Sequence, residues 1–389
     1  MLRGTLALVT FGLLHLPGVL HAQPPDRWTL VRDLRIGNED RANYSLSIVG
    51  DVAVGPGGEI YVAQPQEKLI RQYDARGTFL RAIGRAGSGP GEFQDLDRIG
   101  WKGDTLWAAD RNQYRVNFFT RTGRALGTAG RGSPVVPGSG RPTPPSAALI
   151  DGSMLGWPTP TTSGVQAGSV RTLPLLRMNR AGAIQGGFGT VEVLGAFESI
   201  RRARLVMNLT LPVPFNSLWD VAPNGSSVVV VHRGTAESAD RSTFRVASYR
   251  ASGSAVFDRV YYYTPRTIPA ASRDSIHEML ADQFVRTGFV QAQAQARSFA
   301  RDSVFLPRFQ PPVSDVAVGR DGTIWLGRER LGVRSVEYLV LGPDGGILAS
   351  VAAPPGLRIL QAQRDMVWGV ESDEFDVPYI VRYRVTPAR

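Results

Sequence analysis

The sequence of 389 residues has no cysteine, only two lysines and only four histidines. Without cysteine, the chain can form no disulfide, no thiolate nucleophile, no cysteine-ligated metal site and no bacterial lipid anchor. His15 and His21 fall in a leader described below, which leaves His232 and His277. Two imidazoles are too few for a multi-histidine metal centre. The sequence also lacks a Gly-x-Ser-x-Gly turn, so it does not indicate a serine hydrolase.

The charge is one-sided, because 44 lysines and arginines face 34 aspartates and glutamates, for a formal net charge of +10. Nearly all of the positive charge is arginine, since Lys68 and Lys102 are the only lysines. A basic surface favours acidic partners and the polyanions of walls or membranes, and plain solvated surface charge is the alternative. Nucleic acid is not expected as a partner, because the N-terminus indicates export.

Residues 1–22 have the pattern of a cleavable export signal. Arg3 provides the positive start, Leu6–Leu20 is the apolar stretch, and Ala22 fits the cleavage position. The apolar stretch is too short and too interrupted to span a membrane. We therefore expect a periplasmic or secreted protein without an integral membrane span, whose residues 23–389 form a single domain.

Asp51–Gly84 has the pattern of four short strands joined by glycine-marked turns. One such sheet cannot bury both of its faces, so it needs similar sheets packed against it. The sequence supplies six degenerate units in all, whose first strands begin near the following residues: Asp51, Asp97, Ser146, Asp220, Asp315 and Arg358.

Two features keep a common register in these units. An apolar strand end is followed four residues later by a glycine that can take the positive φ of a tight turn, and these glycines are Gly77, Gly123, Gly182, Gly253 and Gly345. Four units carry a large aromatic residue ten positions after their start, as expected where one sheet packs on the next, and these aromatics are Tyr61, Trp107, Trp325 and Trp368.

The sixth unit is incomplete, because its third strand, Tyr379–Val385, is followed by only four residues. Trp28–Ile36 is an apolar, strand-like run without a partner of its own. We therefore predict an all-β ring of six blades, closed by the N-terminal strand entering the last blade. Closure of this kind protects sheet edges that would otherwise template aggregation.

Thr267–Pro307 interrupts the β pattern. Ser272 precedes apolar residues at helical spacing, and Ala292–Ala300 is rich in alanine and glutamine without a β-branched residue. One helix or a pair of helices is therefore expected at about 268–303, between the fourth and fifth blades.

The segments GSGPGEF and DTLWAADRNQYRVNFFTRTGRAL resemble the NHL repeat of β-propellers. The matching positions are Phe93, Trp107, Asp110, Asn112, Arg115, Phe119 and Gly123. The chain as a whole resembles the exported six-bladed NHL-like propellers of bacteria, and the resemblance is best over Asp51–Gly130. It implies a six-bladed β-propeller that serves as a binding scaffold, with a few enzymatic relatives. Asp110 and Asn112 are expected to cap a turn through side-chain to backbone bonds.

In a propeller, the first strand of each blade lines the central channel. The register therefore gathers Asp51, Asp97, Asp220 and Asp315 there, together with Arg358 and Arg98. Converging carboxylates must be solvated, protonated, paired with arginine or bound to a cation. These six residues are the candidates for a ligand or cation site, and the four aspartates are the candidate metal ligands. The alternative is that each aspartate bonds backbone amides of the neighbouring blade.

Two further charged segments have two interpretations each. Arg201, Arg202 and Arg204 indicate either an anion-binding patch or an edge strand with solvated arginines. The acidic run Glu371–Asp376 lies between the second and third strands of the last blade and indicates either a calcium site or, as its spacing favours, a solvated turn.

These patterns predict an exported, monomeric binding scaffold for a peptide, glycan or protein, with no catalytic constellation and no required cofactor. The alternative is a calcium-dependent, lactonase-like hydrolase that uses the channel carboxylates.

Overall fold

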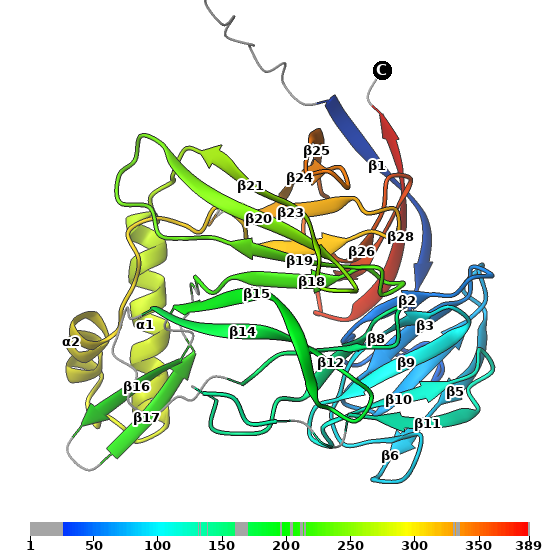
Figure 1. Ribbon diagram of the computed structural model, residues 1–389. Helices are drawn as coiled ribbons and strands as arrows, with labels where there is room; N and C mark the ends of the chain where they lie inside the picture. Colours follow the sequence, from blue (N-terminus) through cyan, green and yellow to red (C-terminus); the bar gives the residue numbers. More distant parts are fainter. Residues whose placement is uncertain are drawn as a thin grey trace, which may run out of the picture.

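The computed structural model describes residues 26–387, apart from 131, 133, 138, 160–169, 195–196, 203–204, 211–212, 214, 330 and 332–334. The expected export signal, residues 1–22, lies outside the described residues. The described part of the chain is nearly all β, with 28 strands and two helices (Figure 1). Neither of these helices is long and apolar enough to cross a membrane.

Four sheets have four antiparallel strands each, in sequence order from one edge to the other. The first contains β2 (Val52–Val54), β3 (Ile60–Gln64), β4 (Leu69–Tyr73) and β5 (Phe79–Ile83). The second contains β8 (Leu96–Lys102), β9 (Thr105–Asp110), β10 (Arg115–Phe119) and β11 (Ala125–Ala129). The third contains β12 (Pro145–Ala148), β13 (Met154–Gly156), β14 (Val170–Met178) and β15 (Ile184–Leu194). The fourth contains β18 (Leu218–Val221), β19 (Ser227–His232), β20 (Ser242–Arg250) and β21 (Ala255–Tyr263).

Eight further strands form one sheet, in the order β22-β23-β24-β25-β1-β28-β27-β26. Its members are β22 (Asp315–Val318), β23 (Ile324–Arg328), β24 (Glu337–Leu341), β25 (Ile347–Ala352), β26 (Arg358–Ala362), β27 (Met366–Ser372), β28 (Pro378–Pro387) and β1 (Asp26–Ile36). Two small sheets, β6 (Arg85–Ala86) with β7 (Glu92–Phe93) and β16 (Phe197–Arg202) with β17 (Leu205–Thr210), complete the β structure described.

The predicted pairing of the N-terminal strand with the last strand is confirmed. β1 runs antiparallel to β28 from Trp28, opposite Pro387, to Ile36, opposite Ile380, and Figure 1 shows the blue strand beside the red one. The expectation of six separate sheets needs correction. The first residues of β1, which include Trp28, also pair in parallel with β25. β1 thereby joins the predicted fifth and sixth sheets into one.

Contacts between sheets run in a closed series, which gives a propeller-like arrangement (Figure 1). β2 contacts β8, β8 contacts β12, β15 contacts β19, β18 contacts β22, β22 contacts β26, and β26 contacts β2. The first strands of five predicted units, β2, β8, β18, β22 and β26, are therefore inner strands that position the cavity described below, whereas the third sheet meets the fourth through β15.

The predicted register is confirmed by the backbone and by burial. The five turn glycines all have φ between 83° and 94°, and the four recurring aromatics are at most 4% exposed. Glycine is required at Gly123 for a second reason. A Cβ atom there would lie 2.7 Å from Ile83 in the neighbouring sheet, so the turn of one sheet packs closely against the outer strand of the sheet before it.

The helical insertion lies where the sequence predicts it, between β21 and β22. α1 (Ala270–Arg286) and α2 (Gln293–Ser303) pack through an apolar cluster that includes Phe284 and Phe289. Met207 of β17 packs on the same cluster. The helices and the β16–β17 hairpin lie together on one side of the molecule (Figure 1), and we call this group the lateral lobe.

The residues of the second sheet that carry the NHL resemblance fix backbone segments. Asp110 accepts hydrogen bonds from the amides of Gln94 (2.8 Å) and Gln113 (3.1 Å). Arg115, which is 1% exposed, donates to the carbonyl oxygens of Ser88 and Glu92. The predicted capping role is thus confirmed for Asp110. Asn112 is exposed, and its side chain makes no hydrogen bond within the described residues.

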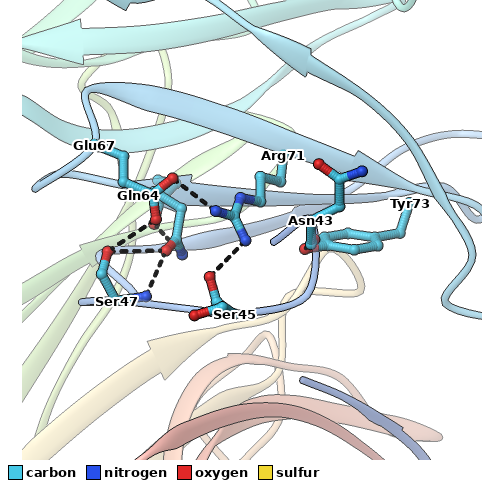
Figure 2. A network of polar contacts seen from close by, with 8 residues as sticks. Asn43, Ser45, Ser47, Gln64, Glu67, Arg71 and Tyr73 are labelled. Carbon is cyan, nitrogen blue, oxygen red and sulfur yellow. Dashed lines mark hydrogen bonds and ion pairs between the residues drawn. The ribbon is translucent and has the colours of Figure 1, made fainter. Parts of the chain in front are cut away.

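Figure 2 shows a comparable network at the end of the second strand of the first sheet. Arg71 donates to the carbonyl oxygen of Ser45 (2.6 Å) and to Glu67 (2.7 Å). Glu67 and Gln64 both accept hydrogen bonds from Ser47. These bonds hold the segment that leads from β1 into the first sheet. The closing strand is therefore fixed both by its pairing with β28 and by the segment that follows it.

The structure describes the acidic run in full and the arginine segment only in part. Asp373 of the acidic run accepts hydrogen bonds from the amides of Phe375 and Val377 within the β27–β28 turn, as the solvated-turn interpretation expects. Arg201 and Arg202 belong to β16, and Arg204 lies outside the described residues.

Candidate ligand-binding cavity

A cavity of about 640 Å³ opens where the inner strands begin. All six residues predicted for the channel line it: Asp51, Asp97, Arg98, Asp220, Asp315 and Arg358. Trp219, Glu329 and Tyr338 also line it, as do several apolar residues, and we call it the channel cavity. The common register explains the convergence, because each of the six residues lies in or directly before the first strand of its predicted unit.

Two of the aspartates join neighbouring sheets, as the alternative interpretation expects. Asp51 accepts a hydrogen bond from the amide of Ile99 in the second sheet (3.0 Å) and another from Val52 (2.8 Å). Asp220 of the fourth sheet accepts one from the amide of Val318 in β22 (2.8 Å). These carboxylates therefore contribute to the closed series of sheets while facing the cavity.

Arg98 is the central cation of the channel cavity. Its guanidinium group makes an ion pair with Asp220 and lies over the ring of Trp219, 5.2 Å from the ring centroid. Burial lowers the pKa of Arg98, but the charges of Asp220 and Asp51 outweigh that effect and raise it. This pair connects the second sheet directly with the fourth, and none of the cavity-lining residues comes from the described part of the third sheet.

Asp315 and Asp97 are less completely engaged. Asp315 accepts a hydrogen bond from the amide of Val316 (2.9 Å) and a long one from the hydroxyl of Tyr338 (3.4 Å). Asp97 lies 3.9 Å from Arg111 and keeps about a third of its side chain exposed. Neither makes a hydrogen bond across to the next sheet within the described residues, so both have acceptor capacity left for a ligand.

Burial changes the protonation of two of these carboxyl groups. It raises the pKa of Asp51 to about 6, although the charge of Arg98 opposes the change. It also raises the pKa of Asp315 to about 6, with the amide of Val316 opposing and the charge of Asp220 adding to the effect. The cavity thus gains negative charge as the pH rises through about 6.

Arg358 and the opposite ends of the inner strands complete the site. Arg358 donates to the carbonyl oxygen of Val49 (2.7 Å), which ties the last sheet to the first. Beyond the cavity, the amide of Trp101 donates to Pro223 (2.9 Å), and Arg320 donates to the carbonyl oxygen of Val54. These bonds join sheets that are not consecutive, at the ends of the inner strands away from the cavity. They therefore hold the inner strands together at that end.

The carboxylates do not form a ready metal centre. Among the residues that the structure describes, no group of three or more His, Cys, Asp or Glu side chains could hold a metal ion. The physical reason is that Asp51 and Asp220 are directed at backbone amides and at Arg98. A calcium ion at Asp51, Asp97, Asp220 and Asp315 would require these contacts to change.

His232 does not form a nucleophilic triad. Its Nδ1 lies 3.4 Å from the hydroxyl of Ser217, but Arg245 contacts its Nε2 at 2.9 Å. Ser217 is 5% exposed and accepts a hydrogen bond from the amide of Glu192. Burial and the charge of Arg245 lower the pKa of His232. This arrangement is typical of a buried structural cluster.

A smaller pocket of about 140 Å³ adjoins the channel cavity, since Ser314 and Glu329 line both. Its other walls include Val213, Pro311 and Leu331. Leu331 and Val213 belong to an apolar cluster that also includes Ile276 of α1. We call this the side pocket, and it lies between the channel cavity and the base of the lateral lobe.

Sequence reasoning missed Trp219, Glu329, Tyr338 and the side pocket. Trp219 directly precedes Asp220, so the strand register contained a signal for it. Glu329 follows β23 and Tyr338 lies in β24, and nothing in the repeat places either near the inner strands.

No family model matches the chain, and no curated protein sequence matches it. Among solved structures, the chain is similar to a member of the DUF4221 family from Bacteroides vulgatus, with 10% identity over 94% of this chain and 100% of that one, and a TM-score of 0.49. It is also similar to a gluconolactonase from Xanthomonas campestris, with 11% identity over 93% of this chain and 99% of that one, and a TM-score of 0.42. A PQQ-bound aldose sugar dehydrogenase from Streptomyces coelicolor has 14% identity over 94% of this chain and 100% of that one, with a TM-score of 0.43. At these values the likeness says nothing about activity.

Proposed function

We propose that this chain is an exported, six-bladed NHL-like β-propeller that binds a ligand in the channel cavity. The six-bladed description counts β22–β25 as one blade and β26–β28 with β1 as another, joined where β1 meets β25. The export signal in the sequence and the NHL-like positions of the second sheet support the rest of the description.

The observation that carries the proposal is the channel cavity itself. Its volume of about 640 Å³ is in the range of small-molecule and peptide side-chain sites. Charged groups from four sheets converge on it, and Asp315 and Asp97 keep free acceptor capacity. Ser314, which lines this cavity, donates to the carbonyl oxygen of Gly327 (3.1 Å) and not to a carboxylate, so the arrangement favours binding over catalysis.

The alternative function is a calcium-dependent, lactonase-like hydrolase. The observation in its favour is that four aspartates line one cavity. Their bonds to amides and to Arg98 count against it. Calcium that raises the melting temperature of the wild type, but not that of Asp51→Ala and Asp315→Ala, would favour the hydrolase. Melting that is unchanged by calcium and by EDTA would favour the scaffold.

The binding proposal is tested by thermal-shift measurements with a panel of basic, acidic and neutral peptides, oligosaccharides and calcium. The panel is applied to the wild type and to Val316→Trp, which adds an indole to the cavity wall. We expect at least one class to raise the melting temperature of the wild type and not of Val316→Trp. Leu360→Trp fills the cavity from another wall position, so the test still stands if Val316→Trp does not fold. The proposal fails if no class stabilises the wild type or if the filled variants respond equally.

A further inference from the structure

The channel cavity has an excess of negative charge that its own arginines do not neutralise. Five carboxylates line it, from Asp51, Asp97, Asp220, Asp315 and Glu329, against only two guanidinium groups. The chain as a whole is strongly basic, with a net charge of +10. An acidic cavity in a basic protein focuses the field on one opening and attracts cations there.

The two arginines of the cavity are already engaged. Arg98 is held by Asp220 and by the ring of Trp219, and Arg358 donates to the carbonyl oxygen of Val49. Their positions leave Asp97, Asp315 and Glu329 as the carboxylates that can accept from a ligand. An anionic ligand would have to displace these internal contacts, whereas a cationic one would not.

The placement of the acidic side chains bears on the kind of cation. No three acidic or histidine side chains of the described residues are placed to hold a metal ion, and calcium requires six to eight oxygen ligands close around it. A guanidinium group, in contrast, is planar and carries five donors that reach acceptors on several sides. Arg98 shows that this cavity accommodates such a group between a carboxylate and an indole ring.

The side pocket indicates what accompanies the cation. It meets the channel cavity at Ser314 and Glu329, and its other walls are the apolar Leu331, Val213 and Pro311 together with Gln310 and Arg233. The guanidinium group of Arg233 is already held by the carbonyl oxygens of Asn216 and Val313. An apolar group attached to the cation could therefore occupy it while the cation stays beside Glu329. A basic residue next to an aliphatic residue in a peptide has this combination.

We propose that the channel cavity binds the guanidinium group of an arginine-containing peptide through Asp97, Asp315 and Glu329, and that the side pocket binds an adjacent aliphatic side chain. This inference rests on the proposed function and names its ligand class. The lateral lobe then acts in specificity, because its base packs against Leu331 and Val213.

Isothermal titration calorimetry with four blocked peptides tests the proposal. The probes are acetyl-leucyl-arginine amide, acetyl-arginyl-leucine amide and their counterparts in which citrulline, the neutral isostere, replaces arginine. One charge-assisted hydrogen bond changes affinity by about tenfold or more. We therefore expect at least one arginine peptide to bind at least about tenfold more tightly than its citrulline counterpart.

Variants locate the binding. Asp315→Asn and Glu329→Gln are each expected to lose about tenfold in affinity for the arginine peptide, and Leu331→Ala to reduce the contribution of leucine only. Asp258→Asn removes the same charge from β21, where Asp258 is half-exposed beside Arg245, and is expected to bind as the wild type does. Equal binding of arginine and citrulline peptides, or equal losses in Asp258→Asn and Asp315→Asn, would overturn the proposal. Binding of an oligosaccharide or calcium at the cavity, without the arginine peptides, would overturn this inference but leave the binding function intact.

Discussion

Replacement of Asp315 by asparagine should be more favourable for stability at neutral pH than in acid. The carboxyl group of Asp315 contacts one donor, the amide of Val316, and one group that can both donate and accept, the hydroxyl of Tyr338. An asparagine in the same rotamer can keep both contacts, because its oxygen accepts from Val316 and its nitrogen donates to Tyr338. The substitution therefore removes the charge with little change in packing.

The magnitude follows from the pKa of Asp315, which burial raises from 3.8 to about 6. The unfolded chain releases this proton at lower pH than the folded one, so the free energy of unfolding of the wild type falls as the pH rises through this interval. The difference between 3.8 and about 6 corresponds to about 3 kcal/mol. Below pH 3.8 the carboxyl group is protonated in both the folded and the unfolded state, so its charge does not affect stability. Above about pH 6 the full destabilising effect of the charge is present.

Urea unfolding monitored by tryptophan fluorescence, from about pH 3.5 to about pH 8, measures this dependence. We expect the free energy of unfolding of Asp315→Asn, relative to that of the wild type, to increase by up to about 3 kcal/mol across the range. Asp258→Asn serves as the control, because an exposed ion pair contributes little. A difference between Asp315→Asn and the wild type that is constant with pH, or that decreases as the pH rises, would refute the reasoning.

Three further substitutions test the fold. Val31→Pro should lower the free energy of unfolding by about 3 kcal/mol or more in urea titrations, because Val31 lies opposite Arg384 at a hydrogen-bonding position of the closing strand β1, where proline removes a ladder hydrogen bond; an unchanged midpoint would contradict its role. Arg115→Ala should cost about 3 kcal/mol in thermal unfolding, because carbonyl groups lose charge-assisted donors, whereas the exposed Arg124→Ala should cost little. Gly123→Ala should destabilise by more than Gly103→Ala, since both positions have positive φ but only the first would clash with a neighbouring sheet; equal melting temperatures for the two variants would argue against that close packing.

The strand repeat was predictable because it depends on local chemistry. The turn at Gly123 needs a residue with positive φ, and the sheet interface needs a large aromatic such as Trp325, so both leave a mark at a fixed spacing. The closing role of Trp28–Ile36 followed from counting strands that lacked partners. The parallel pairing of β1 with β25 left no mark, because a parallel contact between distant strands requires no turn residue.

The channel cavity was predictable only as far as the register extends. Asp51 and Asp315 occupy equivalent positions in repeated strands, so their convergence followed from the ring. Their bonding did not, since it depends on which amide of the neighbouring sheet lies within reach. Glu329 reaches the cavity from beyond the end of β23, and the side pocket depends on contacts with the lateral lobe. Neither arises from a periodic pattern.

The position of β1 has a consequence for how the chain folds. Residues 26–36 are synthesised first, but their partners lie at 347–352 and 378–387, more than 300 residues later. Until those late segments are available, Leu30 lacks the apolar cluster on which it packs, and Leu34 can contact only the first sheet. Assembly must therefore end with the joining of the earliest strand to the latest, a slow event for contacts so far apart. A nascent chain that is interrupted before β28 would leave β1 without its antiparallel partner and accessible to proteases.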